Sequence, residues 1–566
     1  MKKYLFIALA ALGFAACAEH IDGPNAPIHN GELEESYIAI NLMSADSDTR
    51  AAEDSYGYEE GTEAERNINS AYFFFFDENG NPFNVTTSAP GGEKNHLQLT
   101  IGATTGKVDP NVSDIKEAVL ILNTYKGVYP SQIVAVINWT PTANTYTLED
   151  LHDVVANSLG NDTNGYVMSN SVYMDGAGNM VDAVPLTTAN IKTTADAAKS
   201  APIDIYVERT AAKVVLTASG KVENTTSIFT TQKTSSLVGL NNVDVYVQLH
   251  GWELYNDYSS TSLLKNIDTD WDPSALGLTW NDIPFFRCYW AQSQNENPGD
   301  SFSWSYENPT AKGFQTAYGF GIAAANDEYA TRSTYTYCGE NTTTDYRTKV
   351  ILKGQLMQKD GTNYEPLELA RWYGTEYAGN QALRTAVANS LKYILYYKDG
   401  ENYVSIKPED LQCVAGQSVG AEAYEVGFQL SNTDGYGANK TWYKYSSEKG
   451  YEVFGDTAVT GDNVAKTNEY LETVEPALLY AEGQTYYTVD IKHLGATGKT
   501  AEYGVVRNHV YQIDIESIKG YGSPVFSGDI GFLKPEFPTE GEASYVAARI
   551  NVLSWKVVKQ GVDIVQ

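Results

Sequence analysis

The residues of this chain whose spacing could support chemistry are few, and the most obvious set fails on its geometry. Asp268, Asp270 and Asp272 form a D-x-D-x-D run of the kind that opens a calcium loop. An EF-hand also needs glycine at position six and a carboxylate at position twelve, where this chain has Pro273 and Thr279. The sequence therefore does not predict a calcium loop here.

A second motif, formed by Gly319, Gly321 and Ala324, matches the G-x-G-x-x-A pattern of a dinucleotide-binding loop. No strand–helix–strand pattern surrounds it, and tight turns account for these small residues better. The seven histidines are scattered, and the chain has no G-x-S-x-G, H-E-x-x-H or phosphate-binding P-loop motif. We therefore expect no enzymatic activity, no metal site and no cofactor.

The four cysteines are Cys17, Cys288, Cys338 and Cys413, and none lies in a C-x-x-C pair. A zinc or thioredoxin-like site therefore has no support. If Cys17 is set aside, three cysteines remain, so at most one disulfide forms among them. The sequence leaves open whether any two of them pair.

Cys17 ends a segment that is typical of a secretion signal. Two lysines follow the first methionine, and residues 4–14 are apolar but too few to span a bilayer. Two alanines then precede Cys17, as in bacterial lipoprotein signals, in which this cysteine is lipidated. The alternative is ordinary cleavage near this position. A diacyl anchor would give stable membrane attachment.

Arg50 is a candidate substrate for a protease. It lies in residues 45–55, ADSDTRAAEDS, which are small and polar. Exposed segments of this kind are preferred sites of proteolysis. We expect cleavage between Arg50 and Ala51 by an Arg-specific protease. The alternative is a simple loop arginine.

The composition predicts a folded, mainly β protein with more than one domain. The chain has 566 residues, of which 42% are hydrophobic and 19% charged. Its 41 tyrosines and 47 glycines suit strands and turns. We expect the tyrosines to pack across strands on solvent-facing sheets. The formal net charge of −32 argues against nucleic acid as a partner.

Strands at short spacing with many turn signals predict β-sandwiches. In residues 36–44, SYIAINLMS, the side chains of Ile38, Ile40 and Leu42 share one face. Further strands are predicted at 71–76, 133–139, 243–254, 345–358, 484–491 and 508–518. Residues 203–207 and 212–216 form a strand pair or one bent strand. Short helices are predicted at 147–159, beginning near Thr147 or Glu149, and at 380–392, with Asn380 as N-cap.

The end of the chain, residues 549–566, is apolar on both faces of an extended segment, which is unusual for a terminus. It is either the last core strand of its own domain or a strand meant for another molecule. The apolar positions are Ile550, Val552, Leu553, Trp555, Val557, Val558, Val562, Ile564 and Val565.

Five segments together resemble one family. They are FAAC at 14–17, SYIAINLMS followed by DTRAAED around Arg50, VERTAAKV at 207–214, YGVVRNHVYQIDIESIKGYGSPV at 503–525, and INVLSWKV at 550–557. In this combination the chain resembles the fimbrillins of Bacteroidales, the major subunits of type V pili, and is most similar to the pilins of the short (minor) fimbria.

The resemblance implies two transthyretin-like β-sandwich domains in tandem, with short helices and a C-terminal donor strand. The implied parts are a lipoprotein signal (1–17), a propeptide with the removable first strand (18–50), an N-terminal domain (51–220), a C-terminal domain (221–543) and the donor strand (544–566). Cleavage after Arg50 releases the strand with Ile38, Ile40 and Leu42. The C-terminal strand of another subunit then fills the groove.

The implied function is that of a fimbrial stalk subunit that supports adhesion and biofilm formation. The implied partners are identical subunits, anchor and tip subunits, the Arg-specific protease and surface receptors on host or bacterial cells. The precursor would be lipid-anchored at the outer membrane and the mature form extracellular. In the precursor we expect the tail to be loosely held. The alternative is a glycan-binding surface lipoprotein with a platform among Trp271, Trp280, Trp290 and Trp372.

Overall fold

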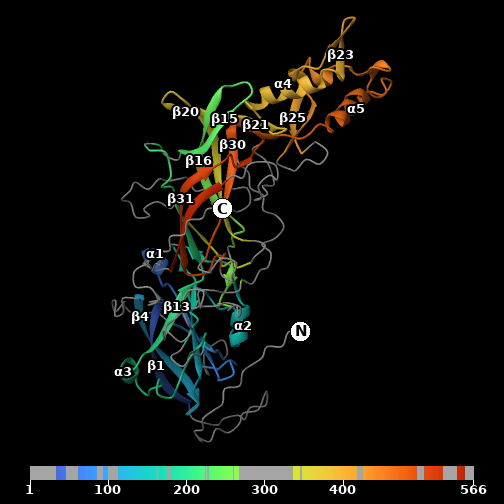
Figure 1. Cartoon of the computed structure of the whole chain (residues 1–566). Coiled ribbons are helices and arrows are strands. Elements are labelled where there is room, and N and C mark those ends of the chain that lie inside the picture. The colour runs from blue at the N-terminus through green and yellow to red at the C-terminus, as the bar shows by residue number, and fades with distance from the viewer. Residues whose placement is uncertain are drawn as a thin grey trace.

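The structure is a computed structural model in which strands predominate and the helices are short, so the predicted mainly β class is confirmed. It describes residues 33–45, 62–85, 93–99, 112–125, 127–161, 163–174, 180–223, 225, 228–258, 260–266, 293, 335–343, 347–416, 425–493, 502–526 and 545–554. The described elements are arranged along an elongated body, from an N-terminal sheet through a two-sheet sandwich to a helical lobe (Figure 1).

The N-terminal sheet curves around a core on one face, and a second buried cluster that includes Phe74 and Val134 covers its other face. Its strand order is β3 (His96–Leu99), β2 (Ala71–Phe76), β5 (Gln132–Ile137), β9 (Met168–Asn170), β13 (Ile203–Arg209), β1 (Leu33–Ala45) and β4 (Val112–Tyr125), with β12 (Val184–Pro185) also paired to β5. Ile40 from β1 and Phe73 from β2 belong to the same buried cluster. The two halves of this sheet therefore face each other across the core, as the layers of a sandwich do.

Helices lie beside this sheet. Helix α2 (Leu148–Asp153) begins at Thr147, whose hydroxyl accepts a hydrogen bond from the Asp150 amide in a capping box. The start of the predicted helix is thus confirmed, but its end is wrong. The chain instead turns into β6 (Val155–Ala156), which pairs with β17 (Thr261–Ser262). The remaining short elements are α1 (Glu63–Arg66), α3 (Ala195–Lys199), β7 (Gly160–Asn161), β8 (Gly165–Tyr166), β10 (Tyr173–Met174) and β11 (Met180–Val181).

The central sandwich is built from two sheets that share one core, which includes Val214, Val247, Leu352 and Ile513. One sheet has the order β18 (Tyr335–Cys338), β14 (Ala212–Thr217), β31 (His509–Lys519), β33 (Tyr545–Ser554). The other has the order β15 (Ile228–Ser236), β16 (Asn242–Tyr255), β19 (Lys349–Asp360), β30 (Gln484–Asp490), β32 (Ser523–Pro524), with β20 (Asn363–Pro366) paired to β19. The strands predicted in these regions are confirmed, with small shifts at their ends.

The segment VERTAAKV is divided between the two domains. Strand β13 pairs with β1 and β9, whereas β14 pairs with β18 and β31. The prediction of a strand pair or a single bent strand is therefore wrong, because the chain passes from one sheet to another at Thr210 and Ala211. The chain thus enters the second sheet before residue 220, the predicted end of the N-terminal domain.

A lobe inserted between β20 and β30 has its own core around Leu383, Phe428 and Trp442. It contains β21 (Leu369–Trp372), β22 (Thr375–Tyr377), α4 (Gly379–Leu391), β23 (Leu395–Asp399), β24 (Asn402–Ser405), η4 (Pro408–Asp410), β25 (Leu411–Ala415), β26 (Val426–Leu430), η5 (Gly437–Asn439), β27 (Trp442–Ser446), β28 (Gly450–Val453), α5 (Asp462–Leu471), β29 (Leu478–Tyr480) and η6 (Ala481–Gly483). The predicted helix at 380–392 is confirmed as α4, but Asn380 is not its N-cap. Ala378 holds that position, and the Asn380 amide donates to Glu368 instead.

Tyrosines cover one face of the four-stranded sheet of this lobe, as expected from the sequence. Residues at alternate positions of β23, β27 and β28 lie on this face. The rings of Tyr403 and Tyr451 stack with centroids 3.8 Å apart, and those of Tyr396 and Tyr451 meet edge to face at 5.0 Å. Such cross-strand aromatic pairs stabilise a solvent-facing sheet.

The glycan-platform alternative loses one of its residues. Trp372 is 8% exposed and donates its indole N–H to the Glu475 carbonyl oxygen at 2.9 Å. The other three tryptophans lie outside the described residues. Cys338 and Cys413 are buried free thiols, so they do not pair with each other, and Cys288 lies outside the described residues.

Candidate functional site

Strand β1 is the earliest described strand of the chain, and it lies inside the N-terminal sheet. It runs antiparallel to β4, from the pair Leu33–Tyr125 to the pair Ala45–Val112. On its other side it runs parallel to β13, from Ile40–Ile203 to Ser44–Val207. Its backbone therefore bonds to a strand on each side, and its removal would leave two unpaired edges facing a gap.

The inward face of β1 is part of the core. Ile38 and Ile40 have no exposed surface and belong to a cluster with Leu120, Leu122 and Ile205. Burial of each isoleucine stabilises the strand by ~1.5–3 kcal/mol. The backbone register continues through Leu42, which lies opposite Lys116 of β4 and Ile205 of β13. The predicted removable strand therefore fills an apolar groove.

The edge of β1 that does not face β4 is bonded, before its ladder with β13, to the segment before α3. The Tyr37 amide donates to the Lys192 carbonyl at 2.7 Å, and the Lys192 amide donates back to the Tyr37 carbonyl at 2.9 Å. Ala39 alternates with Ile38 and Ile40 along the strand and is only 4% exposed on the opposite face. Helix α3 is capped by the Thr194 hydroxyl and packs beside β1.

Strand β33, unlike β1, lies at the edge of its sheet. Among the described strands it pairs with β31 alone, antiparallel, from His509–Ser554 to Lys519–Tyr545. An edge strand can leave without separating any other pair of strands. The expectation that the tail is loosely held is wrong for the backbone of these residues, because they form a ladder with β31. Trp555, Val557, Val562 and Ile564 lie outside the described residues.

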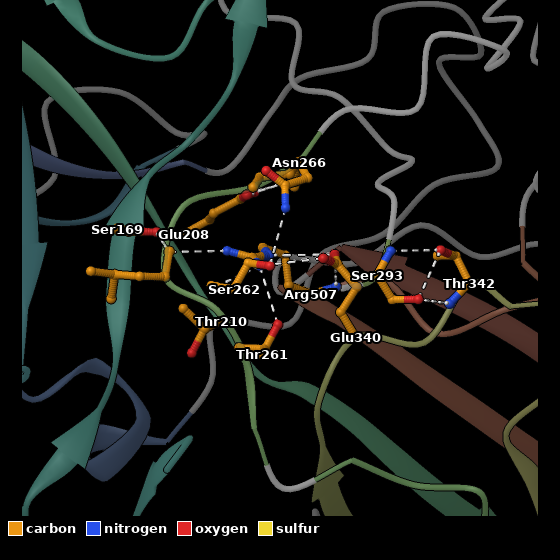
Figure 2. Close-up of polar contacts among 12 residues, drawn as sticks. Ser169, Glu208, Thr210, Thr261, Ser262, Asn266, Ser293, Glu340, Thr342 and Arg507 are labelled. Carbon is orange, nitrogen blue, oxygen red and sulfur yellow. Dashed lines mark hydrogen bonds and ion pairs between the residues drawn. The ribbon is translucent and has the colours of Figure 1, made fainter. Parts of the chain in front are cut away.

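Buried charges join the two domains (Figure 2). Arg507, in the turn just before β31, has no exposed side-chain surface and donates to the Ser262 carbonyl at 2.8 Å and to Thr261 Oγ1 at 3.2 Å. Glu340 completes its surroundings, with Oε1 at 3.3 Å from Nη2. Burial of a guanidinium away from water is costly unless most of its N–H donors are hydrogen-bonded.

A second ion pair reaches the same junction from β13. Lys265 Nζ lies 2.8 Å from Glu208 Oε1, and both side chains are fully buried. Since residues 261–266 contact Arg507 on one side and Glu208 on the other, this segment connects the N-terminal sheet to β31.

Glu65 in α1 forms the third buried contact. Its carboxylate lies 3.0 Å from Lys213 Nζ in β14 and accepts a hydrogen bond from the Tyr337 hydroxyl in β18. Its carbonyl oxygen accepts from Arg209 Nε at 2.7 Å. Burial by itself would raise the pKa of Glu65, but Lys213, Tyr337 and Arg209 together lower it below its ordinary value.

Helix α1 is the first described element after Arg50, and Glu65 fixes it to strands of both domains. Cleavage between Arg50 and Ala51 would therefore leave α1 bound at the junction while β1 is free to leave. Sequence reasoning missed Glu65, because its partners are far from it in the chain. The capping box T-x-x-E at 62–65 was the only local signal.

The region around β33 matches a known family. Residues 478–561 match the family model described as "Major fimbrial subunit protein type IV, Fimbrillin, C-terminal". This region is therefore similar to the C-terminal region of fimbrillins. The match confirms the resemblance seen in the sequence, and it spans β30, β31 and β33. The matched fimbrillin family consists of fimbrial subunits, which agrees with the expectation that the chain is not an enzyme.

The solved structures to which the chain is similar include three fimbrial proteins. They are a fimbrilin from Porphyromonas gingivalis W83 (TM-score 0.34, 12% identity, 93% of this chain and 98% of that one), a fimbrial assembly protein from Parabacteroides distasonis ATCC 8503 (0.29, 12%, 75% and 100%), and the tip fimbrial protein Mfa3 from P. gingivalis (0.24, 10%, 91% and 99%). A comparison with curated proteins gave no match.

The predicted sites of this fimbrillin-like chain are only partly within the described residues. Ile38 and Ile40 are brought together in one core, but Cys17, Arg50 and Ala51 lie outside the description. Within the described ranges, no cluster of three or more His, Cys, Asp or Glu side chains could hold a metal ion. The described helices include none that is long and apolar enough to cross a membrane.

Proposed function

We propose that this chain is the stalk subunit of a type V fimbria that polymerises by strand exchange. The observation that carries the proposal is the position of β1, an early strand that lies between β4 and β13 and fills their common groove. The match of the C-terminal region to fimbrillins supports it. In this proposal β1 occupies the groove in the precursor and prevents premature assembly.

Maturation has three steps. The precursor is exported as a lipoprotein through Cys17 and held at the outer membrane. An Arg-specific protease then cuts between Arg50 and Ala51, and β1 leaves with Ile38, Ile40 and Leu42. The groove between β4 and β13 is now apolar and bordered by unpaired backbone groups, which is a surface that accepts an added strand.

The C-terminal strand of a second subunit fills this groove. Reburial of the two described isoleucine sites alone would gain roughly 3–6 kcal/mol before the cost of ordering the tail and immobilising a subunit. The donor and acceptor surfaces are different parts of the chain, so each added subunit leaves a new free end. Such heterologous contacts grow into a filament.

The proposed partners are identical subunits along the stalk, anchor and tip subunits at its ends, and the maturation protease. The mature form is extracellular in the fimbrium, where it supports adhesion and biofilm formation through receptors on host or bacterial surfaces. Residues 1–50 contribute −4 to the net charge of −32, so the mature chain from Ala51 carries −28, which favours solubility of the exposed polymer.

Limited digestion of the purified precursor with an Arg-specific protease tests the proposal. We expect one early cut at Arg50–Ala51, followed by high-molecular-weight ladders on gels. Deletion of residues 545–566 should leave the cut intact and abolish the ladders, and Arg50→Ala should block both. Cut material that stays monomeric, or filaments that form normally from the Arg50→Ala variant, would contradict the proposal.

A further inference from the structure

The removable strand and the C-terminal strand carry a common sequence. Residues 39–44 read A-I-N-L-M-S and residues 549–554 read R-I-N-V-L-S. Isoleucine, asparagine and serine are identical at the second, third and last positions, and the two positions between them hold apolar residues in both segments. Both segments lie within described strands, β1 and β33.

In both strands this sequence lies antiparallel to a long neighbouring strand. Each is the antiparallel neighbour of a long strand: Ile40 lies opposite Ala118 of β4, and Ile550 lies opposite Ile513 of β31. In β1 the isoleucine of the repeat points into the core and is fully buried. Because side chains alternate along a strand, the asparagine and the residue two positions after it are assigned to the outer face.

We propose that the tail of one subunit enters the groove of the next in the register and direction of β1, with Ile550 replacing Ile40. This proposal rests on strand exchange as the proposed function and specifies its geometry. The tail would run antiparallel to β4 and parallel to β13. In this register Asn551 replaces Asn41, and Val552 replaces Leu42.

In this register β33 fits within the length of β1 at both of its ends. The ten residues of β33, Tyr545–Ser554, correspond to residues 35–44, which lie within the thirteen residues of β1. Ser554 takes the place of Ser44, near the end of the ladder with β13, where the strand leaves the core. A slip of one residue would direct Asn551 into the apolar groove, which costs an unpaired amide.

Two tail residues differ in size from the β1 residues that they would replace in this register. Ala548 would replace the fully buried Ile38 and leave space in the groove. Arg549 would replace Ala39, which is 4% exposed on the opposite face of β1. The two Tyr37–Lys192 hydrogen bonds join β1 to the segment before α3, and their loss when β1 leaves frees that segment to make room for the longer side chain.

Disulfide trapping in the assembled polymer tests the register. Asn41 lies opposite Glu117 of β4, so the variant with Glu117→Cys and Asn551→Cys should form intermolecular disulfides after protease treatment. Glu117→Cys combined with Arg549→Cys or Leu553→Cys gives matched controls for slips of two residues. All variants carry Cys288→Ser, and Cys338 and Cys413 remain because both are buried.

A second pair tests the direction of the inserted strand. Met43 lies opposite Ile115, so Ile115→Cys should link to Leu553→Cys if the tail runs as β1 does. If the tail runs the other way, Ile115→Cys should link to Arg549→Cys. Ladders that form while the cross-links appear only in the slipped or reversed pairs would overturn the register proposal but not strand exchange. Absence of ladders from the uncrosslinked parent would overturn strand exchange itself.

A gain in polymer stability provides an independent readout. Ala548→Ile should fill the site left by Ile38 and slow subunit dissociation by about tenfold or more, since each buried methylene contributes to affinity. Ala547→Ile, on the other face of the strand, is the matched control. If Ala548→Ile dissociates as fast as the parent, or faster than Ala547→Ile, Ala548 does not lie at the Ile38 site.

Discussion

Replacement of Ile40 by alanine should release β1 from the precursor before any protease acts. Ile40 has no exposed surface and packs in the core with Leu120 and Ile205. Truncation of a fully buried isoleucine costs about 2–5 kcal/mol, from lost burial and the cavity left behind. Because each 1.4 kcal/mol is a factor of ten, the open state should become roughly 30-fold to several thousand-fold more populated.

Hydrogen exchange measured by mass spectrometry on residues 36–44 of the uncut precursor is the direct assay. We expect faster exchange in these amides and in their partners on β4 and β13, and a lower thermal midpoint. Size-exclusion chromatography should also detect oligomers without protease treatment, because the open groove can accept a tail.

Ile121→Ala is the matched control for this experiment. Ile121 lies on β4 opposite Tyr37, but its side chain is 46% exposed. Ile121→Ala should lower the free energy of unfolding much less than Ile40→Ala does, since surface substitutions usually change it by no more than about 0.5 kcal/mol. Equal protection of residues 36–44 in the two variants would refute the conclusion that β1 is held in place by its inward face.

Three further predictions concern other parts of the molecule. Glu65→Gln removes the carboxylate beside the buried ammonium of Lys213 and should destabilise the precursor by about 3–5 kcal/mol at pH 7. Because the folded-state pKa of Glu65 is lowered, its contribution to stability is present above its unfolded pKa and is lost as pH falls through the folded value. The difference in thermal midpoint between parent and variant should therefore shrink on acidification. A gap that widens in acid would contradict this. Trp442→Ala removes a fully buried ring and should lower the free energy of opening of the inserted lobe, measured by hydrogen exchange, by about 3–5 kcal/mol. Tyr445 is 43% exposed, so Tyr445→Ala should change this free energy little. Deletion of residues 545–566 removes β33, which lies at the edge of its sheet among the described strands, so circular dichroism should report an intact fold; loss of the β-sheet signal would show that β33 is essential to its own domain.

Much of the strand content could be predicted from local patterns. The run AYFFFF at β2 and the alternation in β16 each determine a strand, because apolar β-branched and aromatic side chains fit a pleated buried surface. Helix α2 began where Thr147 offered a capping box, but its end was set by a partner, β17, about a hundred residues away. The Asn380 cap failed for a similar reason, since Glu368 rather than a local side chain satisfies that amide.

The sequence by itself determined which segments are apolar on one or both faces, and so it identified Ile38 and Ile40 and the tail around Ile550. Tertiary structure alone decided which sheet each strand joins. It divided β13 from β14, placed β1 between two later strands, and set β33 at an edge. The tertiary structure also brings Glu65, Lys213 and the other charged residues of the junction together from distant segments of the chain. Strand pairing and buried ion pairs depend on contacts between residues far apart in the chain, which local periodicity does not encode.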